Sequence, residues 1–140
     1  MSIEEIEKEI VDEFELLGDS WEDKYEHLIE LGKELPLINE KYKTDDRLIK
    51  GCQSRVWLHS ELNDGQLIFT GDSDAIITKG LVGLMIRILS NRAPEEIINA
   101  KLDFVDKIGL KEHLSSTRAN GLVSMIKQMK LDALALKTRS

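Results

Sequence analysis

The sequence predicts an α+β fold, a small antiparallel sheet flanked by helices, and three observations support it. Residues 3–35 carry apolar side chains three or four positions apart, the period of amphipathic helices. Residues 56–70 instead alternate apolar and polar side chains around a turn, as a β-hairpin does. Helical periods return between residues 76 and 129. With 140 residues, 41 % of them hydrophobic, we expect a single domain over residues 1–140.

The first third of the chain predicts a pair of helices. The first helix has an apolar stripe that ends at a glycine: Ile3, Ile6, Ile10, Phe14, Leu17 and Gly18. Ser20 and Asp23 form a start signal for the second helix. Its buried face comprises Trp21, Tyr25, Leu28 and Ile29. Pro36 ends this helix because it cannot donate the helical hydrogen bond, and the polar residues 41–47 predict a loop.

The middle of the chain predicts the hairpin. Asn63-Asp64-Gly65 is a typical turn sequence, because asparagine and glycine accept a positive φ. Leu67 and Phe69 share one face of the returning strand, which we expect to end at Thr70. An isolated hairpin is marginal in water, so it must pack on helices or gain a strand from the segment before Cys52.

The second half predicts the central helix and two further helices. Residues 71–74 (GDSD) are expected to end the hairpin and cap the next helix. That helix is apolar over much of its surface, so we expect it at the centre of the core, and Gly80 and Gly83 would let another element approach closely. A short helix should open at Pro94. A last helix, with an inner stripe, should follow the polar residues 115–117: Leu122, Met125, Ile126 and Met129.

Composition excludes several classes of function. The net charge is −7, yet residues 1–46 carry 16 Asp or Glu and 5 Lys, whereas residues 47–140 carry 10 Asp or Glu and 14 Lys or Arg. Dispersed basic residues and 5 % aromatic residues argue against nucleic-acid binding. No apolar run approaches the ~20 residues of a membrane-spanning helix. The acidic N-terminus fits neither a signal nor a transit peptide, so we expect a cytoplasmic protein with a reduced thiol.

Common enzyme motifs are absent. One cysteine and three scattered histidines do not supply a metal site, and no phosphate-binding loop occurs. A cysteine hydrolase needs a histidine to activate the thiol. His59 lies roughly 23 Å from Cys52 in extended chain. His113 is unconstrained by the sequence, so this alternative stays open.

The single thiol, Cys52, is the strongest candidate for chemistry. It is either a small buried hydrophobic residue or a nucleophile. Gly51 gives the backbone before it the freedom of a tight turn or a mobile loop. Lys50 and Arg55 are cations close in sequence, and we expect them to lower the pKa of the thiol and favour the thiolate. Such a thiol can accept a group and hand it on without acid–base partners.

Several segments resemble the SufE family of sulfur acceptor proteins. The resemblance covers roughly residues 20–130 in the family's order. It rests on the segments 21–25 (WEDKY), 50–57 (KGCQSRVW), 71–75 (GDSDA), 79–81 (KGL) and 114–122 (LSSTRANGL). The departures are mild: Arg55 stands where glutamine is common, and Ser116-Thr117 replaces Pro-Ser.

The resemblance implies a sulfur relay on a fold shared with IscU-type scaffolds. Such proteins take sulfur from the persulfide of a SufS-type or paralogous cysteine desulfurase, stimulate that enzyme and pass the sulfur to an iron–sulfur scaffold complex. Cys52 would be the persulfide acceptor. The protein would need no metal or cofactor of its own, since the desulfurase supplies pyridoxal phosphate. No independent enzyme activity is expected, and a homodimer is left open.

The resemblance also indicates residues around the acceptor. Gly51 and Gln53 would belong to the mobile loop, and Asp74 and Arg118 would organise that loop or contact the desulfurase. The simpler roles are a helix cap for Asp74 and a surface salt bridge for Arg118. Two other functions remain: an iron–sulfur scaffold, which usually needs four protein ligands, and a regulator that only docks on the desulfurase.

Overall fold

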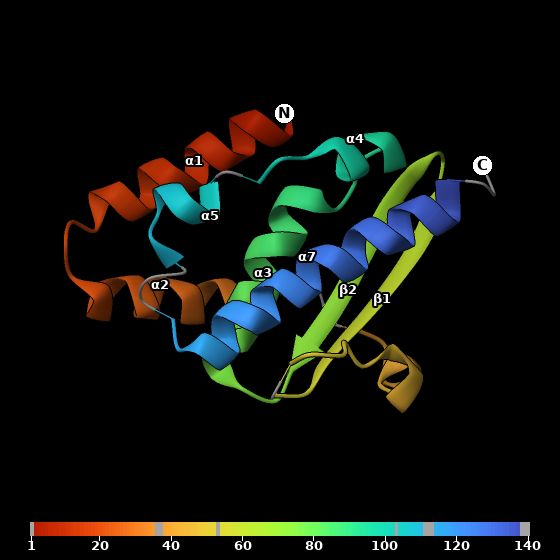
Figure 1. Ribbon diagram of the computed structural model, residues 1–140, viewed down its shortest axis with the longest axis horizontal. Coiled ribbons are helices and arrows are strands. Elements are labelled where there is room, and N and C mark those ends of the chain that lie inside the picture. Colours follow the sequence, from red (N-terminus) through yellow and green to blue (C-terminus); the bar gives the residue numbers. More distant parts are fainter. Residues whose placement is uncertain (1, 36–37, 53, 103, 111–113, 138–140) are drawn as a thin grey trace.

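The computed structural model describes residues 2–35, 38–52, 54–102, 104–110 and 114–137, and it confirms the α+β prediction. A two-stranded antiparallel sheet packs with helices, α1 and α2 lie together at one end, and α7 runs along the hairpin (Figure 1). The elements are α1 (Ile3–Leu16), α2 (Trp21–Lys33), the 3₁₀ helices η1 (Glu40–Tyr42) and η2 (Asp45–Arg47), β1 (Val56–Asn63), β2 (Gln66–Ser73), α3 (Ile76–Leu89), α4 (Pro94–Asn99), α5 (Phe104–Lys107) and α7 (Ser116–Lys137).

The predicted helical pair at the N-terminus is confirmed. The hydroxyl of Ser2 accepts a hydrogen bond from the backbone of Glu5, whose carboxylate accepts one from the backbone of Ser2, and this capping box starts α1. Ser20 starts α2 by accepting a hydrogen bond from the backbone of Asp23. Helix α2 ends at Lys33, and Pro36 lies outside the described residues.

The hairpin is longer than predicted. Both strands have eight residues, and the ladder runs from Asn63 opposite Gln66 to Val56 opposite Ser73. The prediction that residues 71–74 end the hairpin and cap α3 was therefore wrong, because residues 71–73 still pair with β1. Asp64 and Gly65 at the turn have φ of 51° and 79°, as a tight two-residue hairpin turn requires.

The segment before Cys52 adds one bridge to the sheet rather than a strand. Leu48 pairs with Trp57 in an isolated bridge, and the backbone N–H of Ile49 donates to the carbonyl of Val56 at 2.9 Å. The polar residues 41–47, predicted as a loop, contain all of η2 and most of η1. The hairpin is thus supported mainly by the helices packed on its inner face.

Helix α3 is the centre of the core, as predicted. Its side chains Leu81, Leu84 and Met85 are fully buried. The predicted close approach at Gly80 is confirmed, since a Cβ atom there would lie 2.1 Å from the carbonyl oxygen of Leu28 in α2. The inner face of the hairpin and the stripe of α7 complete the core: Val56, Leu58, Leu67, Phe69, Leu122, Met125 and Met129 are buried, and Ile126 is partly buried.

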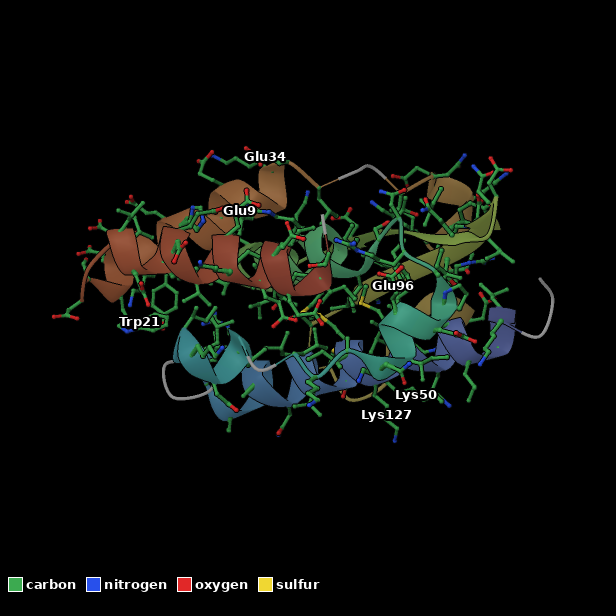
Figure 2. All side chains as sticks on the ribbon, turned by 90° about the horizontal axis from the view of Figure 1, so that it is seen from above. Glu9, Trp21, Glu34, Lys50, Glu96 and Lys127 are labelled. Carbon is green, nitrogen blue, oxygen red and sulfur yellow. The ribbon has the colours of Figure 1, made fainter. Side chains whose placement is uncertain are left out.

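The remaining elements close the fold around α3. Helix α4 begins at Pro94, as predicted, and packs on α7, whereas α5 was not predicted. Figure 2 shows Glu9 and Glu34 on the side of α1 and α2, and Lys127 on the side of α7. Among the described residues, no helix is both long and apolar enough to span a membrane.

Candidate functional site

The backbone before Cys52 makes a turn that only glycine fits. Gly51 has φ of +92°, a region that residues with a side chain rarely adopt. A Cβ atom at this position would lie 2.5 Å from the hydroxyl oxygen of Ser124 in α7. Positive φ and close approach to α7 together fix where the next residue, Cys52, is placed.

The thiol of Cys52 contacts α7. Its Sγ atom lies 3.6 Å from the carbonyl oxygen of Gly121, to which the thiol donates a hydrogen bond. A Cβ atom on Gly121 would lie 3.4 Å from Sγ, so the missing side chain leaves the sulfur free space on this side. Cys52 is half-buried, packed against the core without being sealed inside it.

A cavity of about 260 Å³ opens beside the sulfur. The loop of Cys52, the first turn of α3 and the start of α7 form its walls. Its lining is rich in hydroxyl groups and carries one charged side chain: Cys52, Ser54, Thr78, Ser115, Thr117, Arg118 and Gly121. The start of α7 is ordered by Ser115, whose hydroxyl accepts a hydrogen bond from the backbone of Arg118 at 3.3 Å.

Burial raises the pKa of the Cys52 thiol. The expectation that Lys50 and Arg55 lower this pKa was wrong. Both residues are exposed, and adjacency in sequence does not bring their charges to the sulfur. The thiol therefore stays protonated in the resting protein, in agreement with its hydrogen bond to the carbonyl of Gly121.

Asp74 holds the chain that follows Cys52. Its carboxylate Oδ1 accepts a hydrogen bond from the backbone N–H of Arg55 at 3.0 Å, and its own N–H donates to the carbonyl of Arg55 at 3.2 Å. The alternative role as a helix cap was wrong: Ala75 is the N-cap of α3, and it makes no side-chain hydrogen bond to the helix. Asp74 ties the start of α3 to the segment between Cys52 and β1.

Arg118 lies at the exposed edge of the cavity, on α7. Within the described part of the chain, no carboxylate lies at ion-pair distance from its guanidinium group, so the alternative of a surface salt bridge finds no partner there. Gln53, the other predicted loop residue, falls outside the described residues. The structure thus brings together Gly51, Cys52 and Arg118, and Asp74 is hydrogen-bonded to the segment that follows Cys52.

Sequence reasoning missed five residues that line this cavity: Ser54, Thr78, Ser115, Thr117 and Gly121. Thr78 is the one uncharged polar residue of the mainly apolar helix α3, which is a signal that the sequence offers. Gly121 lies in the segment 114–122 that carried the family resemblance, although nothing in the sequence joins it to Cys52.

His59 does not serve Cys52 in this structure. Its ring stacks on Tyr42 with centroids 3.6 Å apart, and its nitrogens contact Arg47 and Glu61. His59 lines a separate cavity of about 310 Å³ instead, and no described histidine lines the cavity of Cys52. His113, the other candidate base, lies outside the described residues. Across the described ranges, no three His, Cys, Asp or Glu residues are grouped to hold a metal ion.

Comparisons with known proteins match almost the whole chain. The family model described as "SufE: Fe-S metabolism associated domain" matches residues 8–133. An uncharacterised SufE-like protein of Rhizobium meliloti is 47 % identical over 130 residues, covering 89 % of this chain and 92 % of that protein. An uncharacterised SufE-like protein of Rhizobium etli is 42 % identical over 132 residues, covering 89 % of this chain and 87 % of that protein.

A solved structure supports the fold independently. The solution structure of a hypothetical protein from Thermus thermophilus superposes with a TM-score of 0.78 and covers 96 % of each chain. Its sequence is 19 % identical, so this likeness concerns the fold alone.

Proposed function

The chain belongs to the SufE family of proteins associated with Fe–S metabolism, and from this premise we propose that it is a sulfur acceptor that works with a cysteine desulfurase. The observation that carries the proposal is the placement of Cys52. The single thiol of the chain is half-buried beside a cavity of about 260 Å³, so it is neither locked in the core nor freely exposed. A protein that carries a reactive sulfur between partners needs both protection and access.

The transfer step balances without any redox partner. The thiolate of Cys52 attacks the outer sulfur of the persulfide on the desulfurase, as in thiol–disulfide exchange. A new bond forms between Sγ of Cys52 and that sulfur, the donor S–S bond breaks, and the donor cysteine leaves as a thiolate. Pyridoxal phosphate on the desulfurase supplies the earlier carbon–sulfur cleavage. The sulfur is then handed to an iron–sulfur scaffold by the same exchange.

The resting geometry requires a change before transfer. The raised pKa and the hydrogen bond to the carbonyl of Gly121 favour the protonated, inward-facing thiol. Docking of the desulfurase must therefore turn the loop of Cys52 outward and expose the sulfur to the donor. We propose that the turn at Gly51 is the hinge and that Asp74 holds the loop closed until docking. In the cytoplasm, where thiols stay reduced, Cys52 would be ready to accept sulfur.

Mass spectrometry tests the proposal directly. The protein is incubated with a pyridoxal-phosphate cysteine desulfurase and cysteine, and the intact mass is measured. We expect a mass increase of one sulfur atom on Cys52, and no increase in Cys52→Ser. A wild-type protein that remains unmodified while the desulfurase is loaded with persulfide contradicts the proposal.

A Cys52→Ala variant discriminates the two remaining functions. If the protein were a regulator that only docks, Cys52→Ala would stimulate the desulfurase as well as the wild type does. A scaffold would take up iron and develop visible absorbance on reconstitution, although one cysteine per chain is far from the four ligands that clusters usually need. The sulfur acceptor predicts loss of stimulation in Cys52→Ala and no cluster absorbance.

A further inference from the structure

The cavity of Cys52 contains a buried hydroxyl group that the fold does not use. Thr78, the third residue of α3, is 6 % exposed and lines the cavity. Among the described residues, it is one of two buried polar side chains; the other, Ser73, accepts a hydrogen bond from the backbone of Ala75. The hydroxyl of Thr78 makes no hydrogen bond to any described residue.

This unused hydroxyl is open to the cavity. In the described part of the chain, every side-chain oxygen or nitrogen that is sealed from solvent has a hydrogen-bond partner. The hydroxyl of Thr78 has none, so solvent must reach it, and the cavity is the open space that this residue lines. Threonine in a helix commonly bonds to the carbonyl four residues earlier, whereas here the group is left unpaired in the cavity that Cys52 also lines.

The cavity has room for one additional sulfur atom on Cys52. An S–S bond places the outer sulfur about 2 Å from Sγ. The cavity of about 260 Å³ is far larger than that atom needs. Gly121 on α7 contributes no side chain next to Sγ. Of the other hydroxyl groups on its lining, those of Ser115 and Thr117 belong to exposed residues at the start of α7, and that of Ser54 belongs to a partly exposed residue of the loop. Thr78 is therefore the most buried of the hydroxyl donors on the lining.

The chemistry of the site changes when Cys52 carries sulfur. The outer sulfur of a persulfide is more acidic than a thiol, so it is an anion near neutral pH and requires hydrogen-bond donors when it is enclosed. We propose that the hydroxyl of Thr78 donates a hydrogen bond to the outer sulfur of the Cys52 persulfide and stabilises its anion in the cavity. This inference rests on the proposed function of Cys52 as a sulfur acceptor.

The charged groups around the outer sulfur act from the rim. Arg118 on α7 is the one charged residue that lines the cavity among those described, and it adds positive potential at the mouth. Lys50 and Arg55 on the loop are exposed, and the carboxylate of Asp74 at the start of α3 is bound to the backbone of Arg55. Thr78 supplies the directional contact that these charges do not.

The test loads Cys52 chemically, with inorganic polysulfide on the full chain, so that it does not depend on a desulfurase. The near-ultraviolet absorbance of the persulfide anion is then titrated with pH, and the lifetime of the persulfide is followed. In Thr78→Val, which keeps the shape and removes the hydroxyl, we expect the persulfide to titrate about one pH unit higher and to decay several-fold faster. Thr78→Ser should restore the wild-type values, and Thr70→Val, in β2 and outside the lining of this cavity, should leave them unchanged.

The outcomes separate this inference from the proposed function. Equal titration of wild type and Thr78→Val overturns the role of Thr78, whether or not a desulfurase loads Cys52. The titration and lifetime of the chemically loaded persulfide could depend on Thr78 although no desulfurase ever loads Cys52. That result supports this inference and contradicts the sulfur relay. Should Thr78→Val fail to fold, Thr78→Ala removes the hydroxyl without added bulk and is read in the same way.

Discussion

The Sγ atom of Cys52 and the carbonyl oxygen of Gly121 lie 3.6 Å apart, although 69 residues separate them in the chain. A carbonyl oxygen accepts a hydrogen bond and does not donate one, so this contact stabilises the thiol and not the thiolate. Burial acts in the same direction on the pKa of Cys52. Both effects favour the protonated thiol, which is a weaker nucleophile than the thiolate.

The reactivity of Cys52 should therefore depend on pH in a defined way. Because burial raises its pKa, the rate of alkylation by iodoacetamide should rise with pH to a midpoint above the ~8.5 of a free cysteine. At neutral pH the folded protein should react more slowly than the protein unfolded in urea. A midpoint below that of the unfolded chain would contradict the buried, uncharged resting thiol.

The same shift predicts how stability varies with pH. A pKa raised by folding contributes stability that is fully present below the unfolded pKa and is lost as pH rises through the folded pKa. The free energy of unfolding should thus decline above about pH 8.5 in the wild type. Cys52→Ser lacks this group, so its urea-unfolding profile should be flatter over the same alkaline range and serves as the control.

Local patterns predicted the elements of this fold, and long-range contacts decided the rest. Periodicity located α1, α2 and the hairpin, because each buries one face, and a dense run of apolar residues located α3, which is buried over most of its surface. The strand β2 extends beyond the predicted end at Thr70, because its pairing with β1 continues to Ser73. Such pairing between strands is a long-range contact that a local pattern does not show. Helix α5, with four residues, is too short to carry a readable period.

The sequence predicted the reactive residue of the site, but it did not predict the surroundings of that residue. Cys52 stood out as the single thiol beside a glycine. Its pKa was predicted in the wrong direction, because Lys50 and Arg55 are neighbours in sequence and burial is not visible there. Thr78 and Gly121 line the same cavity as Cys52 only once α3 and α7 pack against the loop, so no local pattern connects them to the sulfur.

Removing the carboxylate of Asp74 should loosen the loop of Cys52. The two hydrogen bonds between Asp74 and Arg55 tie this loop to α3, and an alanine at position 74 keeps only the backbone one. In Asp74→Ala we expect alkylation of Cys52 to become about fivefold faster at constant pH. Asp74→Asn retains the acceptor oxygen and should stay closer to wild type. Equal rates in wild type and Asp74→Ala would show that this contact does not restrain the loop.

The turn at Gly51 allows a controlled test of close packing. Gly18 also has a positive φ, +67°, but nothing lies within 4 Å of a Cβ atom placed there. Gly18→Ala should lower the free energy of unfolding by about 1 kcal/mol, the cost of the backbone conformation alone. Gly51→Ala should cost up to about 1 kcal/mol more, because its Cβ would also lie 2.5 Å from the hydroxyl oxygen of Ser124, which must rotate away.

A double-mutant cycle identifies the source of that extra cost. Ser124→Ala removes the hydroxyl that the new Cβ would meet, so it should recover part of the stability that Gly51→Ala loses. Urea unfolding of the four proteins in the cycle measures the coupling between positions 51 and 124. Strict additivity of the two changes would mean that the strain lies in the backbone and not in the contact with α7.

An ion pair between α1 and α3 should make the fold sensitive to acid. Arg87 donates two hydrogen bonds to the carboxylate of Glu13, one of them at 2.9 Å, and this contact, with a smaller one from His27, lowers the pKa of Glu13. A lowered pKa gives stability that is present above the unfolded value and lost as pH falls through the folded value. Glu13→Gln should therefore lower the free energy of unfolding by about 1 kcal/mol at neutral pH, a modest figure because solvent screens the partly exposed pair. At acid pH, where the carboxylate of the wild type is protonated, the substitution should change the free energy of unfolding very little.

Glu9 is the matched control. Its carboxylate lies 3.5 Å from the same guanidinium group, and its side chain is 49 % exposed against 31 % for Glu13. Glu9→Gln should therefore be nearly neutral in urea unfolding at both neutral and acid pH.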